Sequence, residues 1–314
     1  MDGLIAALVG IVGSILLTPV VRTIAIRLDI VDRPGELKPQ RAPVAYLGGV
    51  AVFLATLLGP LISQRAWVLL PMALALGLGL ADDVRPLAVP LRVGVEIGIA
   101  TVAALVVPGT GLTRIATAVL VIGLLNAVNL LDGQDGLAAG VGAAIAIGFS
   151  FLGGAATPIG LSLAGALLGF LVLNRPPARI YLGDAGAYLV GTTIAVLPAL
   201  SRHSTMRWSL WWAAPLLVAM PIADTTIAIV RRLRARRPIL SGDRSHVYDQ
   251  LVDRGMSVGR STLLCVGAQL VFTTLGFAAT QARPVAALAI TILVAFAAAG
   301  LAWRADFLTV GRGS

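Results

Sequence analysis

Eleven apolar runs, each close to membrane-spanning length, decide what this chain can fold into. A helix needs about 20 apolar residues to cross a bilayer. The chain is 58% hydrophobic and 12% charged, with a mean hydropathy of +0.92. Soluble domains carry roughly 25% charge, so only lipid can solvate so many apolar side chains from outside. The runs cover about residues 4–26, 44–62, 67–81, 91–107, 114–129, 137–152, 159–173, 186–200, 209–230, 261–280 and 284–303.

These runs predict an all-α, polytopic membrane protein with about eleven transmembrane helices in a single domain, residues 1–314. The run 67–81 is short and the run 91–107 contains Glu96, so a count one higher or lower stays open. The longest connection, 231–260, is too short for a separate soluble domain.

Arginine and lysine predict the orientation of the chain. The connections after the first, third, fifth, seventh and ninth runs, with the C-terminal tail, hold 19 of the 24 basic residues. Because cytoplasmic loops are enriched in these residues, we expect a plasma-membrane protein with its N-terminus outside and its C-terminus in the cytoplasm. Basic loops that face anionic lipid explain the net charge of +9, so nucleic acid is not expected as a partner. The basic residues outside those connections are Arg65, Arg114, Arg202, Arg207 and Arg283.

Most carboxylates fall on the same predicted inner side, although the rule for basic residues does not require it. Short polar loops explain any single acid. An inner face rich in both charge signs, however, is typical of a site. The acids on this side are Asp29, Asp32, Glu36, Asp82, Asp83, Asp132, Asp135, Asp184, Asp243, Asp249, Asp253 and Asp306.

The first acidic motif, LADDVRPL at 80–87, places Asp82 and Asp83 directly after an apolar helix. A helix C-terminus carries partial negative charge, so two carboxylates there need compensation from Arg85 or a metal ion. A solvated pair in a loop is an equally good explanation of this motif alone.

The second motif, NAVNLLDGQDGLAAG at 126–140, places Asn126, Asn129, Asp132 and Asp135 at the end of an apolar run. Glycines between the acids permit a tight turn and close approach to a ligand. Polar groups at membrane depth are costly and indicate function. A helix cap at Asp135 would explain one of these four residues but not the others.

The third motif, NRPPARIYLGDAGAYLVG at 174–191, places Asp184 between glycines just before a helix, with Asn174 at the end of the preceding run. Such a turn could hold a metal ligand beside phosphate-binding amides. N-capping by Asp184 is the alternative.

Two basic segments complete the inner face. In the connection 231–255, His246 lies close to Asp243, Arg244 and Asp249, and arginines there could bind lipid headgroups or phosphate. Lys38, in KPQRAPVAYLGGV at 38–50, is the only lysine of the chain and could bind an anion.

The sequence contains no Walker A loop, GxGxxG, HExxH or CxxC motif. The remaining oxygen-rich set suits Mg²⁺, or Mn²⁺, which binds one or two carboxylates together with substrate phosphates. We therefore expect phosphoryl-transfer chemistry.

Together and in this order, the motifs from about Lys38 to Gly255 resemble those of the polyprenyl-phosphate sugar-1-phosphate transferases, glycosyltransferase family 4. Eleven spans and the segment DRSHVYDQLVDRG look most like the GlcNAc-1-phosphate branch. The resemblance implies a Mg²⁺-dependent enzyme at the cytoplasmic membrane face. A UDP-sugar would give its sugar-1-phosphate, that of an N-acetylhexosamine, to a polyprenyl phosphate and release UMP.

The resemblance also assigns roles to individual residues. It implies catalytic roles for Asp82, Asp83, Asp132, Asp135 and His246, substrate binding by Lys38, Asn126, Asn129, Asn174 and Arg244, and metal binding by Asp184 and Asp83.

The chain departs from the family pattern at two points. The HxHH pattern is reduced to His246-Val247-Tyr248-Asp249, and Ala187 stands where serine is common. The first departure leaves the sugar open. Three alternatives remain: transfer of phospho-MurNAc-pentapeptide, an intramembrane prenyltransferase, and an ion-coupled transporter that uses Glu96 and Asp224. A homodimer is possible.

Overall fold

The computed structural model describes residues 1–33, 43–202, 208–236, 238 and 246–308. Within these residues, eight helical segments are long and apolar enough to cross a membrane. They are α1 (Asp2–Arg27), η1 with α4 (Ala66–Val68 and Leu69–Val84), α5 (Val89–Val106), α6 (Gly111–Leu131), α8 (Ala156–Asn174), α9 (Gly183–Leu200), α13 (Val258–Thr280) and α14 (Pro284–Arg304).

The other described elements are shorter. Helices α10 (Trp208–Leu217) and α11 (Ala219–Arg234) form a bent pair that would make a ninth span. The remaining helices are α2 (Gly48–Thr56), α3 (Leu58–Ile62), α7 (Leu137–Ser150) and α12 (Val247–Asp253). Strands β1 (Val31–Asp32) and β2 (Val44–Ala45) pair antiparallel.

Helices cover most of every apolar run, with Val44–Ala45 in strand β2, so the prediction of an all-α polytopic membrane protein is confirmed. The described residues give eight or nine spans where about eleven were predicted. Two runs are not the single straight helices that hydropathy predicted. The run 44–62 divides into α2 and α3 at Leu57, and the run 209–230 bends by 66° between α10 and α11.

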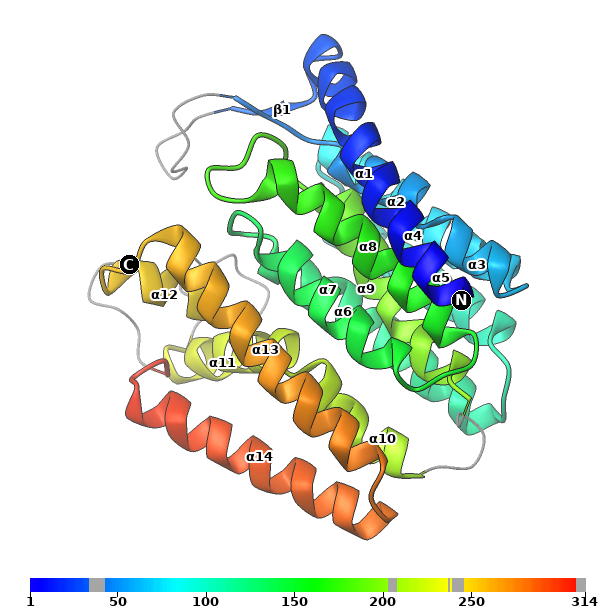
Figure 1. Cartoon of the computed structure of the whole chain (residues 1–314). Coiled ribbons are helices and arrows are strands. Elements are labelled where there is room, and N and C mark those ends of the chain that lie inside the picture. Colours follow the sequence, from blue (N-terminus) through cyan, green and yellow to red (C-terminus); the bar gives the residue numbers. More distant parts are fainter. Residues whose placement is uncertain (34–42, 203–207, 237, 239–245, 309–314) are drawn as a thin grey trace.

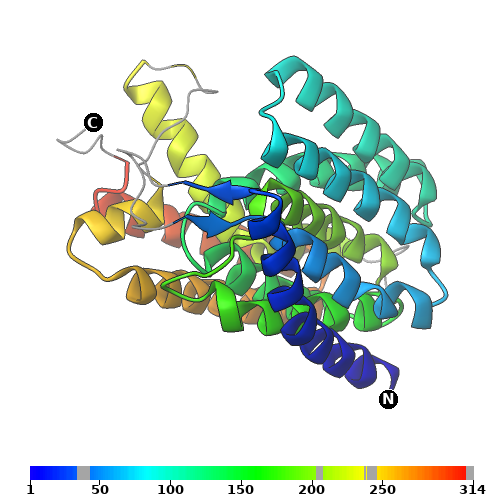
Figure 2. The same ribbon diagram turned by 90° about the horizontal axis from the view of Figure 1, so that it is seen from above.

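Helix α9 is the centre of the bundle. It packs against α2, α4, α6, α7 and α8, and nearly all of its residues are buried. Seen from above, α10 to α14 lie on one side of the central green helices, and the blue and cyan helices up to α6 lie on the other (Figure 2).

Small residues let the other helices approach α9 closely. Gly79 of α4 lies directly on the backbone of Ala185, and Gly49 of α2 lies on Gly186. A side chain at either glycine would overlap main-chain atoms that cannot move aside. This close packing, typical of membrane helices, fixes the end of α4 beside the first turn of α9.

The connections that follow the odd-numbered apolar runs meet at one end of the bundle, as the orientation argument requires. The chain begins at the opposite end, while α14 ends beside α12 (Figure 1). The contacts that join these connections are Tyr181 N to Ala45 O, Asp184 N to Asp83, Ala178 N to Asp135, Tyr248 Oη to Leu130 O and Gln250 Nε2 to Phe307 O.

The packing of α4 on α9 can be tested with two neighbouring glycines. We expect Gly79→Ala to destabilise the protein by about 1–3 kcal/mol, because its methyl group forces α4 away from α9. Gly77→Ala is the matched control, since no atom lies within 4 Å of its added methyl group. Thermal unfolding in detergent measures both, and equal stability of the two variants would contradict this account.

Candidate active site

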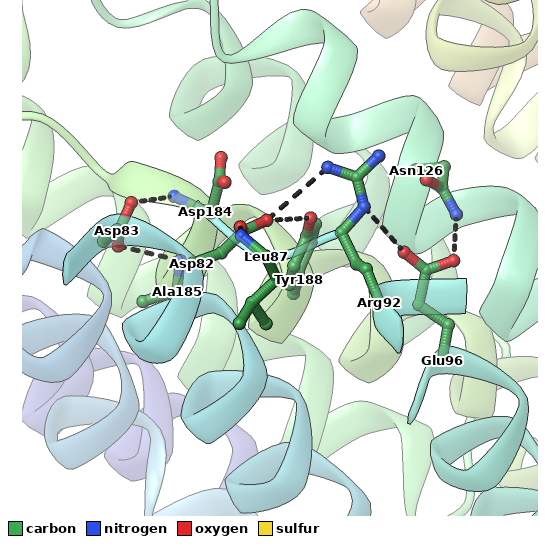
Figure 3. A network of polar contacts seen from close by, with 9 residues as sticks. All are labelled: Asp82, Asp83, Leu87, Arg92, Glu96, Asn126, Asp184, Ala185 and Tyr188. Carbon is green, nitrogen blue, oxygen red and sulfur yellow. Dashed lines mark hydrogen bonds and ion pairs between the residues drawn. The ribbon is translucent and has the colours of Figure 1, made fainter. Parts of the chain in front are cut away.

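Asp83 joins the end of α4 to the start of α9. Its Oδ1 accepts the N–H of Asp184 at 2.9 Å, and its Oδ2 accepts the N–H of Ala185 at 3.1 Å (Figure 3). The first N–H groups of a helix have no partner within the helix, and this end carries partial positive charge. A carboxylate from another helix therefore caps α9.

This arrangement excludes two alternatives that the sequence left open. Asp184 does not cap its own helix, because Asp83 takes that position. Arg85 does not compensate the acids at the end of α4, because its side chain is exposed and Arg92 lies beside Asp82 instead.

Asp82 is buried and already holds several donors. Its Oδ1 accepts the N–H of Leu87 at 2.7 Å. Its Oδ2 accepts the Tyr188 hydroxyl at 3.3 Å and lies 3.5 Å from Nη1 of Arg92. These contacts fix the direction in which the carboxylate points (Figure 3).

From Asp82, a polar chain runs between the membrane-spanning helices α5 and α6. Arg92 lies between Asp82 and Glu96, with its Nε 3.6 Å from Glu96 Oε1. Glu96 Oε2 accepts a hydrogen bond of 2.8 Å from Asn126 (Figure 3). Asn126 is therefore engaged with α5. The Arg92–Glu96 pair was missed from the sequence, although ionisable residues four apart on an apolar helix were the available signal.

Asp132 and Asp184 bring two further carboxylates to the capped start of α9. Asp184 lies close enough to Asp83 and Asp82 for their charges to repel. Asp132 follows the last residue of α6. Its partial burial and the neighbouring carboxylates of Asp184 and Asp83 raise the pKa of Asp132. Four carboxylates, from the end of α4, the end of α6 and the start of α9, thus converge, with Arg92 beside them.

Asp135 lies at the edge of this group. Its Oδ2 accepts the N–H of Ala178 at 2.9 Å, which ties the 132–136 turn to the loop before α9. Burial of the carboxyl raises the pKa of Asp135, against the effect of that hydrogen bond. Gly136 begins α7 without a side-chain cap, so Asp135 is not the helix cap that the sequence left open.

Two predicted substrate-binding amides occupy different surroundings. Asn174 is buried and donates to the carbonyl of Ile180 at 2.9 Å, which closes the loop before α9. Asn129 is half-buried, and its side chain has no hydrogen bond to another described residue. Contact of either residue with a substrate stays a prediction.

His246 is connected to α11 by a direct contact and to α6 through its neighbour Tyr248. Its Nδ1 lies 2.6 Å from Asp224, and its ring stacks on Tyr248 with 5.4 Å between centroids. The Tyr248 hydroxyl donates to the carbonyl of Leu130, two residues before Asp132. Lys38 and Arg244, also predicted from the sequence, lie outside the described residues.

Two tyrosines that sequence reasoning missed border the carboxylates. The rings of Tyr46 and Tyr181 lie 6.0 Å apart and are tilted by 55°. Burial, with the charges of Asp135 and Asp32, raises the pKa of Tyr181 to about 12. Both phenols therefore stay neutral at physiological pH and provide aromatic surface beside the acids.

The cluster of aspartates at the start of α9 fits a hard divalent cation. Among the described side chains, no three of His, Cys, Asp or Glu form a ready-made metal site. Mg²⁺, however, usually takes only one or two carboxylates and completes its shell with water and substrate phosphates. Asp83 accepts one N–H on each oxygen and keeps a lone pair on each for a further ligand. Mutual repulsion among Asp83, Asp132 and Asp184 favours a cation between them.

Comparison with known proteins shows the family. The model for glycosyl transferase family 4 matches residues 66–202, which contain both aspartates of α4 and the start of α9. A decaprenyl-phosphate N-acetylglucosaminephosphotransferase of Mycolicibacterium smegmatis is 30% identical in an alignment that covers 82% of this chain and 78% of that protein. This chain belongs to glycosyl transferase family 4.

As a family 4 member, the protein is a membrane-embedded phosphoglycosyl transferase. It is also 29% identical over 299 residues to a probable undecaprenyl-phosphate N-acetylglucosaminyl 1-phosphate transferase of Bacillus subtilis, with 86% of this chain and 82% of the relative covered. A phospho-N-acetylmuramoyl-pentapeptide-transferase of Heliobacterium modesticaldum is 37% identical, but only over 117 residues, or 36% of this chain and 34% of the relative. A transporter is therefore the wrong class.

The Arg92–Glu96 pair of this family 4 transferase gives a testable prediction. We expect Arg92→Gln to destabilise the protein by about 1–3 kcal/mol, because it leaves the buried acid Glu96 without its cation. Adding Glu96→Gln should restore part of that loss, since an amide is cheaper to bury than a carboxylate. Thermal unfolding of both single variants and the double variant measures the coupling.

Arg85→Gln is the control for this cycle, because Arg85 is exposed on the same connection. It should leave the unfolding temperature unchanged. Strict additivity of the Arg92 and Glu96 substitutions would show that the two side chains do not depend on each other.

Proposed function

We propose that the protein transfers a sugar-1-phosphate from a UDP-sugar to a membrane polyprenyl phosphate, with Mg²⁺ as cofactor, and releases UMP. The observation that carries this proposal is the convergence of Asp82, Asp83, Asp132 and Asp184 at the capped start of α9. An oxygen-rich, repelling carboxylate group beside membrane-spanning helices suits the handling of phosphates that belong to a lipid and a nucleotide.

The relatives support the choice of substrates. The two relatives that cover most of this chain are named for transfer of N-acetylglucosamine phosphate to undecaprenyl or decaprenyl phosphate. We therefore propose an N-acetylhexosamine as the sugar. Transfer of phospho-MurNAc-pentapeptide has weaker support, because that relative matches about a third of the chain.

The reaction must bring two anions together. An oxygen of the acceptor phosphate attacks the β-phosphorus of the donor, which carries the sugar, and the bond between this phosphorus and the bridging oxygen breaks. UMP leaves with that oxygen, and a polyprenyl-diphosphate-linked sugar remains. Repulsion between the two substrates is large in a partly dry site. When bound, Mg²⁺ would offset this repulsion and polarise the diphosphate. Asp184 and Asp83 would hold the ion.

Asp82 suits placement better than proton removal. A phosphate monoester has a second pKa of about 6, so the acceptor is mostly dianionic at neutral pH and attacks directly. Leu87, Tyr188 and Arg92 already fix the Asp82 carboxylate. Asp82 would thus hold Arg92 toward the acceptor phosphate.

The site would face the cytoplasm of a bacterial cell, with the N-terminus outside. The basic residues on the connections at the site end of the bundle support this orientation. The substrates support it too, because nucleotide sugars are cytoplasmic metabolites.

The direct test uses purified protein with undecaprenyl phosphate, Mg²⁺ and a donor panel of UDP-GlcNAc, UDP-GalNAc and UDP-MurNAc-pentapeptide. We expect UMP and a lipid-linked sugar from one of the N-acetylhexosamine donors. Formation of UMP only from the pentapeptide donor would replace the sugar assignment, and no UMP from any donor would overturn the proposal. Released inorganic diphosphate would indicate a prenyltransferase.

The metal assignment predicts a specific defect for Asp184→Asn. We expect at least a tenfold loss of rate at low Mg²⁺ and a raised half-saturating Mg²⁺ concentration, because outer and inner metal ligands contribute on that scale. Asp253→Asn, an exposed acid on α12, is the charge-matched control. An unchanged Mg²⁺ response in Asp184→Asn would place the ion elsewhere.

Asp82→Asn distinguishes placement from base catalysis. If Asp82 serves placement, the variant should lose activity relative to the unchanged protein to the same extent at pH 6 and pH 9, because the protonation of the acceptor phosphate then affects both proteins alike. Initial rates of UMP release at both values measure this. Recovery at pH 9 alone would instead show that Asp82 removes a proton.

A further inference from the structure

The bend between α10 and α11 is held by one buried side chain from another helix. In an unbroken helix the carbonyl of Leu217 would accept the N–H of residue 221, but Pro221 has none. Gln269 of α13 supplies the missing donor, with its Nε2 2.9 Å from Leu217 O. Its Oε1 accepts the N–H of Met220 at 2.9 Å.

These two hydrogen bonds matter because the break lies within the apolar bundle. Backbone groups without partners cost several kcal/mol in such surroundings. Gln269 is fully buried, so it satisfies both groups without water. The bend of 66° is therefore a fixed feature, and it sets the direction in which α11 continues.

The direction of α11 brings Asp224 to the start of α12. Its Oδ2 lies 2.6 Å from Nδ1 of His246, and its Oδ1 accepts the N–H of Val247 at 2.8 Å. The side chain of Asp224 is 0% exposed and that of His246 is 5% exposed. Both oxygens of this buried carboxylate therefore contact the same segment, one at the His246 ring and the other at the N–H of Val247.

The other contacts of the histidine ring complete its orientation. Tyr248 stacks on one face at an interplanar angle of 5°, and its hydroxyl is anchored at Leu130 beside the Asp132 turn. As the N-cap residue of α12, His246 also forms a capping box with Asp249, whose Oδ2 accepts the N–H of His246 at 3.3 Å. A carboxylate at Nδ1 fixes the proton on that nitrogen and leaves Nε2 for a ligand.

We propose that Asp224 is a positioning residue of the transferase. It holds His246 with Nδ1 toward α11, so that Nε2 is presented to the diphosphate of the sugar-nucleotide donor. Gln269 maintains the helix break that makes this pairing possible. The inference rests on the proposed function for the identity of the ligand, but not for the orientation of the ring.

The orientation can be measured without any turnover. The chain has 2 histidines, so His203→Gln leaves His246 as the only one. With ¹⁵N-histidine labelling, we expect NMR spectra of this variant to show a hydrogen-bonded proton on Nδ1. In Asp224→Ala the proton should move to Nε2, which is the tautomer that an isolated neutral imidazole prefers.

Kinetics provide the second readout. In Asp224→Ala we expect kcat/KM for the UDP-sugar to fall about 10- to 100-fold, the range seen when the carboxylate partner of a ligating histidine is removed. KM for the polyprenyl phosphate should stay within twofold. If the role of Asp224 were merely structural, the kinetic constants for both substrates would worsen to the same extent. Asp253→Asn is the control and should change neither value.

The outcomes separate the two proposals. If the protein forms no UMP from any donor, the proposed function fails, whereas the NMR result still tests the orienting contact. An unchanged tautomer in Asp224→Ala, or equal losses for donor and acceptor, would overturn the role of Asp224. If Asp224→Ala does not fold, Asp224→Asn carries the kinetic test, because it removes the negative charge while its amide oxygen can still accept the proton of Nδ1.

Discussion

The capping of α9 by Asp83 is the contact on which the rest of the site depends. It joins the end of one spanning helix to the start of another and satisfies two backbone N–H groups at the membrane boundary. Because Gly79 lets α4 lie directly on Ala185, this cap forms without displacing either helix. Asp82 and Asp184 become neighbours as a result of this single contact.

The same requirement, that polar groups at membrane depth must be paired, explains the outlying parts of the site. Arg92 is held between two acids, and Gln269 replaces the hydrogen bonds lost at the α10–α11 break. Each of these contacts also positions a group that belongs to the candidate active site. Arg92 is directed toward Asp82, and α11 is directed toward His246, so structural satisfaction and the placement of charged groups have the same cause.

Sequence reasoning succeeded where the signal was local and failed where it was not. The acids of three motifs were predicted to converge, and they do. Arg92 was missed as the partner of Asp82 because α5 must first turn back against α4, ten residues later. Asp224 was assigned only to a rival function, because its contact with His246 spans 22 residues and requires a bend that hydropathy does not detect.

By itself, the sequence determined that the chain is a helical membrane protein, roughly where its spans lie, and which connections carry the acids. Hydropathy and charge are properties of short segments, so they survive without a fold. The tertiary structure alone decided which acid caps which helix, which arginine stands beside Asp82, and which nitrogen of His246 is held. Those outcomes depend on contacts between helices far apart in the chain, and such contacts exist only after packing has brought the helices together.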